Sequence, residues 1–255
     1  MTQATLESHP SSGAELVDTE GRTLPLRGSH LSVRAGGGYA RATLRQTFFN
    51  PYAEPLRVTY KLPLPADGAV AGFAFELEGW RTEGVVKPRE TARRDYERGL
   101  LEGRTAALLE QERTSLFTQE LGNIPPGASV GVEVSTDQPL EFDGGSWGLR
   151  YPTVVGPRYL GTLGRTPDAE RVTVPVAASL EVDARVQLDL HIDDAMTGPP
   201  SSPSHRIHTH EGAVRLHEPE GVPLDRDLVI RWHVAQAEAR IALVAGRPAE
   251  GHARS

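Results

Sequence analysis

"YARATLRQTFF", residues 39–49, alternates small or apolar side chains with polar ones along its length. The apolar side of this stretch carries Ala40, Ala42, Leu44 and Phe48, and arginine and threonine occupy most positions between them. A period of two residues predicts a β-strand with one face in a core and the other in water.

The same alternation recurs along the chain, in residues 55–65, 72–80 and 179–193. Turn-forming residues separate these stretches, among them Asn50-Pro51 and the segment from Pro65 to Gly68. Strands with one wet face and one dry face are typical of antiparallel sandwiches. We therefore predict a mainly β protein built as an antiparallel β-sandwich.

One segment, "KPRETARRDYERGLLEG" at residues 87–103, has the pattern of a helix instead. Pro88 suits a first helical position, and Gly103 suits the residue after the last turn. Ala92, Tyr96 and Leu100 form a single apolar stripe, which predicts an amphipathic helix from about 88 to 102 packed on the sandwich.

The charged side of this helix is the candidate partner-binding surface. We expect most of its charged side chains to point to solvent, and the candidates are Arg89, Arg93, Arg94 and Glu97. Guanidinium groups make bidentate contacts and are enriched in protein interfaces.

Residues 104–127 are predicted to form two strands and a turn. We expect Leu108 or Leu109 to pack inside the sandwich with Phe117 and Leu121. Glu110, Glu112 and Arg113 have two interpretations. The carboxylates could act in acid–base chemistry, or they could pair with arginine where helix and sandwich meet, with Glu112 and Arg113 near the surface. We favour the ion pairs.

The predicted organisation has four parts. Residues 1–22 are expected to be a mobile tail, 23–160 the β-sandwich, 161–236 a second, smaller β domain, and 237–255 a C-terminal tail or linker.

Composition argues against several classes of function. The formal net charge of −7 disfavours binding to nucleic acid or to an anionic membrane. The chain has no cysteine, which excludes thiolate catalysis and cysteine-based zinc sites. It also lacks a run of ~20 apolar residues and an N-terminal secretory pattern, so we expect a cytoplasmic protein.

Histidines near residue 205 are the best metal candidates. His208 and His210 would share one side of a strand, with His205 before them and His217 on the next strand. Zinc needs three or four ligands in tetrahedral geometry, and we expect these side chains to face solvent instead. The sequence has no GxSxG, GxGxxG or P-loop pattern, and we predict no metal and no cofactor.

Four blocks together resemble the VIT (vault protein inter-alpha-trypsin) domain in order and spacing. They lie at residues 60–80, 87–99, 103–127 and 149–159, and the resemblance runs from about 23 to 160. "SPSH" at 202–205 and "LDRDLVIRW" at 224–232 resemble the region that follows VIT domains in bacterial proteins with a von Willebrand factor A domain. The metal loop of that A domain, DxSxS, is absent from this sequence.

The resemblance implies a β-sandwich with one packed helix and a role in protein assembly. We therefore predict a non-enzymatic protein–protein interaction and scaffolding module. Its expected partners are proteins, including a von Willebrand factor A domain in the same or another chain. The alternative is a hydrolase or metal-dependent enzyme whose site is assembled from scattered residues. A deep pocket with converging titratable groups would favour the enzyme.

Overall fold

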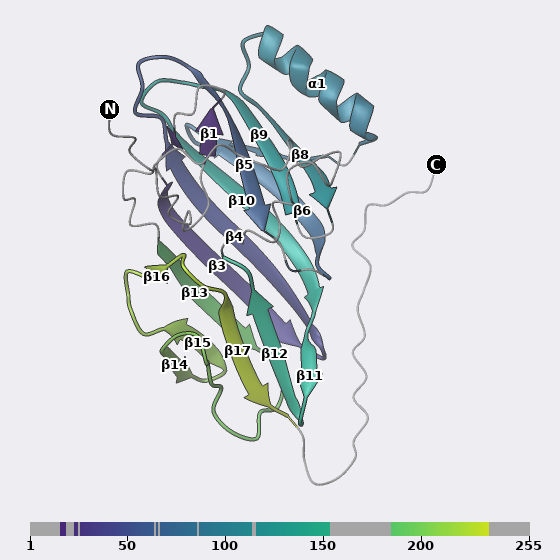
Figure 1. The fold of residues 1–255 in the computed structure, drawn as a ribbon, viewed down its shortest axis with the longest axis vertical. Helices are drawn as coiled ribbons and strands as arrows, with labels where there is room; N and C mark the ends of the chain where they lie inside the picture. The colour runs from purple at the N-terminus through teal and green to yellow at the C-terminus, as the bar shows by residue number, and fades with distance from the viewer. Residues whose placement is uncertain are drawn as a thin grey trace, which may run out of the picture.

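The computed structural model describes residues 16–18, 23–24, 26–63, 65, 67–85, 87–113, 116–153 and 185–234. These residues form three sheets and one helix (Figure 1). The prediction of a mainly β protein with a single packed helix is confirmed for them.

Sheet A has five strands in the order β2-β1-β5-β9-β8, and all its pairs are antiparallel. The strands are β1 (Leu16–Asp18), β2 (Thr23–Leu24), β5 (Leu56–Pro63), β8 (Ala106–Arg113) and β9 (Leu116–Ile124). Strand β1 lies within the range that the sequence predicts as an N-terminal tail, and it pairs with β5.

Sheet B has nine strands. Eight follow the order β14-β15-β13-β3-β4-β10-β6-β7, and the ninth, β16, also pairs with β13. Its strands are β3 (Leu26–Gly36), β4 (Tyr39–Phe49), β6 (Ala69–Leu77), β7 (Trp80–Glu83), β10 (Ser129–Pro139), β13 (Arg185–Ile192), β14 (Ile207–His210), β15 (Ala213–Leu216) and β16 (Val222–Pro223).

Sheet C contains three strands in the order β11-β12-β17. They are β11 (Glu141–Asp143), β12 (Ser146–Tyr151) and β17 (Leu228–His233). Sheet A lies over one end of sheet B and sheet C over the other (Figure 1). Pro63 at the end of β5 and Tyr151 at the end of β12 line one small cavity together with Leu31 and Leu44 of sheet B.

The helix, α1, spans Arg89–Leu101, close to the predicted range. It lies beside sheet A, and β8 is the strand with which it makes most of its contacts (Figure 1). The described part of the chain contains no helix that is both long enough and apolar enough to span a membrane.

The two faces of sheet B differ as the alternating sequence predicts. Its inner face supplies much of one continuous hydrophobic cluster, including Phe48 and Leu31. Its outer face carries cross-strand ion pairs, such as Arg41 with Asp137 and Arg45 with Glu133. Exposed pairs of this kind contribute about 0–1 kcal/mol each, so the buried face supplies most of the stability.

The parallel pairing of β13 with β3 is the main feature that the sequence does not predict. It runs from Val186 opposite Ser29 to Ile192 opposite Ala35. Strand β17 likewise pairs with β12. The described strands of the predicted second domain therefore belong to sheets B and C together with strands of the predicted first domain, and both groups contribute to one hydrophobic cluster.

This shared packing makes a prediction about cooperativity. Leu188 on β13 is buried in the common cluster, and Leu188→Ala should lower the free energy of unfolding by about 2–5 kcal/mol. In urea titrations the wild type and the variant should each unfold in one transition. His191→Ala, on the exposed face of the same strand, is the control and should cost less than about 1 kcal/mol. Two separate transitions, with only one of them shifted, would show two independent units.

Candidate functional site

The four candidate residues on α1 divide into two pairs. Arg94 and Glu97 are exposed, as expected. Arg93 is only 35% exposed, and its guanidinium contacts Glu110 and Glu120. The expectation that most of the four point to solvent is confirmed, and Arg93 is the exception. Arg89 is 55% exposed and also reaches Glu110. The reason is that carboxylates on sheet A lie directly beneath this side of the helix.

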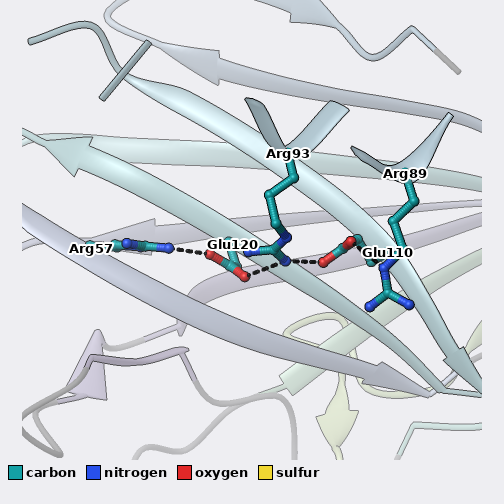
Figure 2. A network of polar contacts seen from close by, with 5 residues as sticks. All are labelled: Arg57, Arg89, Arg93, Glu110 and Glu120. Carbon is teal, nitrogen blue, oxygen red and sulfur yellow. Dashed lines mark hydrogen bonds and ion pairs between the residues drawn. The ribbon is translucent and has the colours of Figure 1, made fainter. Parts of the chain in front are cut away.

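These contacts form one chain of alternating charges across four elements (Figure 2). On β5, Arg57 donates to Glu120 of β9 at 2.6 Å. Arg93 of α1 donates to Glu120 at 3.1 Å and also contacts Glu110 of β8. Arg89 donates through Nε to Glu110 at 2.8 Å. We call these five residues the helix anchor.

Burial explains why the helix anchor contains an excess of arginine. The side chains of Glu110 and Glu120 are 7% and 14% exposed. An unpaired carboxylate at such a position would be strongly destabilising, and three guanidinium groups compensate these two. The predicted Glu–Arg pairing is thus confirmed for Glu110, whereas the side chains of Glu112 and Arg113 lie outside the described residues.

The electrostatics of Glu120 favour an ionised carboxylate. Burial acts to raise the pKa of Glu120, but hydrogen bonds and positive charge from Arg57 and Arg93 outweigh it, so the pKa lies below its ordinary value. A general acid requires the opposite shift, towards neutral pH. Glu120 therefore lacks the shift that a general acid would need.

Close packing at Gly122 also holds the helix against sheet A. A Cβ atom on this β9 residue would lie 2.2 Å from Leu100 Cδ2 and 3.2 Å from Tyr96 Oη. Tyr96 is buried there, beneath the guanidinium of Arg57, and burial raises its pKa to about 12. Asn123 follows with a left-handed backbone (φ 56°), and its Nδ2 donates to the carbonyls of Leu100 and Arg104. The predicted stripe of Tyr96 and Leu100 therefore contacts sheet A.

The predicted core residues of β8 and β9 are confirmed. Phe117 and Leu121 are buried in the hydrophobic cluster, and Leu109 packs against it. Leu108 is also buried but lies outside that cluster, on the same side of β8 as Glu110.

A cleft of about 710 Å³ opens beside the helix, and we call it the α1 cleft. Its walls come from β6, the segment Gly84–Val85, one side of α1, and the consecutive residues Arg104–Leu109. This volume is in the range of ligand-binding sites. The sequence does not reveal the cleft, because its walls are brought together only by the packing of two sheets and the helix.

The charged side chains that line the α1 cleft have partners of opposite sign. Lys87 donates to Asp95 at 2.6 Å, Arg104 pairs with Glu102, and Glu83 lies 3.8 Å from Arg81. The hydrogen bond from Lys87 is the main cause that holds the pKa of Asp95 below its ordinary value. The cleft therefore presents compensated charges and apolar surface rather than a cluster of free carboxylates.

The histidine candidates lie at the opposite end of sheet B. His208 and His210 are exposed on β14, and the rings of His208 and His217 lie 4.4 Å apart. His205 contacts Ser204 through Nδ1 instead. Within the described residues no three potential metal ligands come together.

Two members of the helix anchor were not singled out from the sequence. Arg57 and Glu120 lie on neighbouring strands, and their residue types match the polar face of the alternation. From the sequence, each of the two residues occupies a polar position of a strand. That position does not show that a helix lies over Arg57 and Glu120.

Residues 26–136 match the family model of the Vault protein inter-alpha-trypsin domain. The matched range contains α1 and all five residues of the helix anchor. This match supports the assignment of that part of the chain to the VIT family.

Curated relatives are much longer proteins. The chain is 30% identical over 147 residues to human protein mono-ADP-ribosyltransferase PARP4, covering 58% of this chain and 8% of the relative. It is 26% identical over 225 residues to mouse von Willebrand factor A domain-containing protein 5A, and the match covers 84% of this chain and 28% of the relative. The chain thus spans less than a third of either relative.

Among solved structures, a putative nutrient binding protein from Legionella pneumophila matches with a TM-score of 0.43 at 11% identity. The match covers 88% of this chain and 72% of that one. A similarity at this level supports no comparison of function.

The helix anchor predicts that charge reversal lowers stability at Arg93 but not at its neighbour Arg94. Arg93→Glu would place a third carboxylate beside Glu110 and Glu120, and it should lower the free energy of unfolding by about 2–4 kcal/mol. Arg94→Glu makes the same change of charge on the exposed side and should shift it by no more than about 0.5 kcal/mol. Urea unfolding measures both, and equal stabilities would contradict the role assigned to Arg93.

The lowered pKa of Glu120 predicts how its contribution depends on pH. Because the folded-state pKa lies below the ordinary value of 4.5, ionised Glu120 stabilises the fold fully above that value. The stabilisation is lost as the pH falls through the folded-state pKa. Glu120→Gln should therefore be less stable than the wild type near neutral pH, and the difference should shrink on acidification. A difference that stays constant in urea unfolding down to about pH 3 would contradict this.

Proposed function

We propose that the protein is a non-enzymatic interaction and scaffolding module whose partner is a von Willebrand factor A domain, in the same or another chain. The observation that carries the proposal is the similarity to von Willebrand factor A domain-containing protein 5A, which extends over 84% of this chain. That relative contains the proposed partner domain by name, and this chain covers 28% of it.

The proposed contact surface is the outer side of α1, formed by Arg94, Glu97 and Leu101, which we call the outer helix face. All three side chains are exposed, and Leu101 is 90% exposed. An apolar side chain beside mixed charges suits a protein surface, because interfaces bury apolar area and arginine is enriched among the residues that contribute most to binding. Arg89 and Arg93 hold the helix in place beneath this face.

Two further properties belong to this proposal. The protein is assigned to the bacterial type of VIT protein because the motifs at 202–205 and 224–232 resemble those proteins. A location in the cytoplasm is likewise part of the proposal.

Binding measurements with charge and apolar variants test the proposal. The purified A domain of the mouse relative should bind the chain in biolayer interferometry. Leu101→Glu and Arg94→Glu should each weaken binding by about fivefold to thirtyfold, since interface residues of these types contribute about 1–2 kcal/mol. Thermal midpoints should hardly change because both side chains are exposed.

The matched control is Arg206→Glu, an exposed arginine before β14, at the end of sheet B opposite α1 (Figure 1). It should bind like the wild type. If the wild type shows no binding to the A domain, the proposed partner is wrong. If all three variants bind equally, the outer helix face is not the contact surface.

A further inference from the structure

Strand β8 has one free edge in the part of the chain that the structure describes. It is the last strand of sheet A, and there it pairs with β9 alone. Alternate backbone N–H and C=O groups of an edge strand point away from its one partner. Such an edge is a template for pairing with another extended chain.

The α1 cleft lies beside the first half of this strand, from Ala106 to Leu109. Its lining includes every residue from Arg104 to Leu109, although successive side chains of a strand point to opposite faces of a sheet. Leu108 lies on the helix side and Leu109 packs against the sandwich cluster. A cavity that touches both faces passes beside the strand, where the backbone groups are, and it also reaches Phe117 of β9.

The wall facing β8 is largely apolar. It includes Val70, Phe73 and Phe75 of β6, and Val85 beyond β7. Val85 is 74% exposed, so a ligand would cover apolar surface that now faces water. Side chains on one side of an added strand would contact this wall, while its backbone paired with β8.

The charges of the cleft indicate a neutral ligand. The cations Lys87 and Arg104 are bound to Asp95 and Glu102, and Glu83 lies near Arg81. The charged lining residues are two cations, Lys87 and Arg104, and two anions, Glu83 and Asp95, so the cleft has no net charge to attract a charged ligand. A neutral segment would leave the ion pairs intact.

We propose that the α1 cleft binds an uncharged, extended peptide segment with alternating apolar side chains, which adds as a strand to the free edge of β8. Backbone hydrogen bonds supply affinity in this mode, and pockets for alternate side chains supply selectivity. The inference rests on the proposed function, because it adds a second binding surface to the same interaction module.

The helix anchor keeps this edge accessible. It holds α1 over the outer face of sheet A through Glu110 and Glu120, whose side chains point away from the sandwich. The C-terminal end of α1 is fixed by Asn123. The helix therefore forms one wall of the cleft.

The test uses synthetic peptides of about nine residues, the length of an ordinary strand, in which threonine alternates with valine, leucine or phenylalanine. Each peptide has blocked ends and a fluorescent label, and binding to the full chain is read by fluorescence anisotropy. At least one peptide should bind with a dissociation constant below about 100 µM. Failure of the whole panel would overturn the proposal.

Backbone pairing is tested by N-methylation. Two versions of the binding peptide carry N-methyl groups on alternate residues, one on each edge of the extended peptide. Only methylation of the edge that pairs with β8 should weaken binding, by about tenfold or more, because it removes hydrogen-bond donors. Equal binding of both versions would contradict strand addition, because the peptide would then bind through its apolar side chains alone. In hydrogen exchange, the peptide should slow the amides between Arg104 and Leu109.

Matched variants separate this proposal from the proposed function. Val85→Glu lies in the cleft and should weaken peptide binding by about tenfold. Leu101→Glu, also an exposed apolar residue changed to glutamate, lies outside the cleft lining and should not affect it. The A domain should show the reverse sensitivity. Loss of peptide binding in both variants would contradict the cleft as the peptide site. If light scattering shows that the wild type is a dimer and that Val85→Glu is a monomer, the cleft is occupied by a second copy of the chain and not by a peptide.

Discussion

The apolar face of sheet B is the constraint on which the rest of the structure depends. Sheet B has nine strands and its central strands present one side to the core, while sheet A has five strands and sheet C three. Both smaller sheets lie over that side, and their side chains join one hydrophobic cluster (Figure 1). Residues 185–234 pack with the VIT-like region because β13 extends sheet B and β17 extends sheet C.

A second constraint decides which surface of α1 is available for binding. Two carboxylates on sheet A are almost fully buried under the helix, and buried charges need compensation. Arg89 and Arg93 supply it together with Arg57. The arginines that look equivalent in the sequence therefore have different roles: Arg89 and Arg93 bind the carboxylates of sheet A, whereas Arg94 stays exposed on the outer helix face.

Local patterns predicted the local structure well. The period of two in residues 39–49 predicted β4 and its buried face, and the stripe of Tyr96 and Leu100 predicted the buried side of α1. The parallel pair of β3 and β13 could not be predicted, because nothing in either strand specifies a partner about 160 residues away. The sequence predicted that Glu110 pairs with an arginine, but it identified neither Arg93 as that arginine nor Glu120 as the second carboxylate, because these groups come close only after β8 and β9 pair beneath the helix.

The helix anchor relates the two candidate binding surfaces to each other. The outer helix face and the α1 cleft lie on different sides of α1, so both depend on the same fixed helix position. The anchor fixes that position through charges on β5, β8 and β9, and Gly122 fixes it through close packing. A change that loosens the helix would alter both surfaces at once. A change on one exposed side chain would alter only the surface that carries it, because packed elements transmit displacement whereas isolated surface side chains do not.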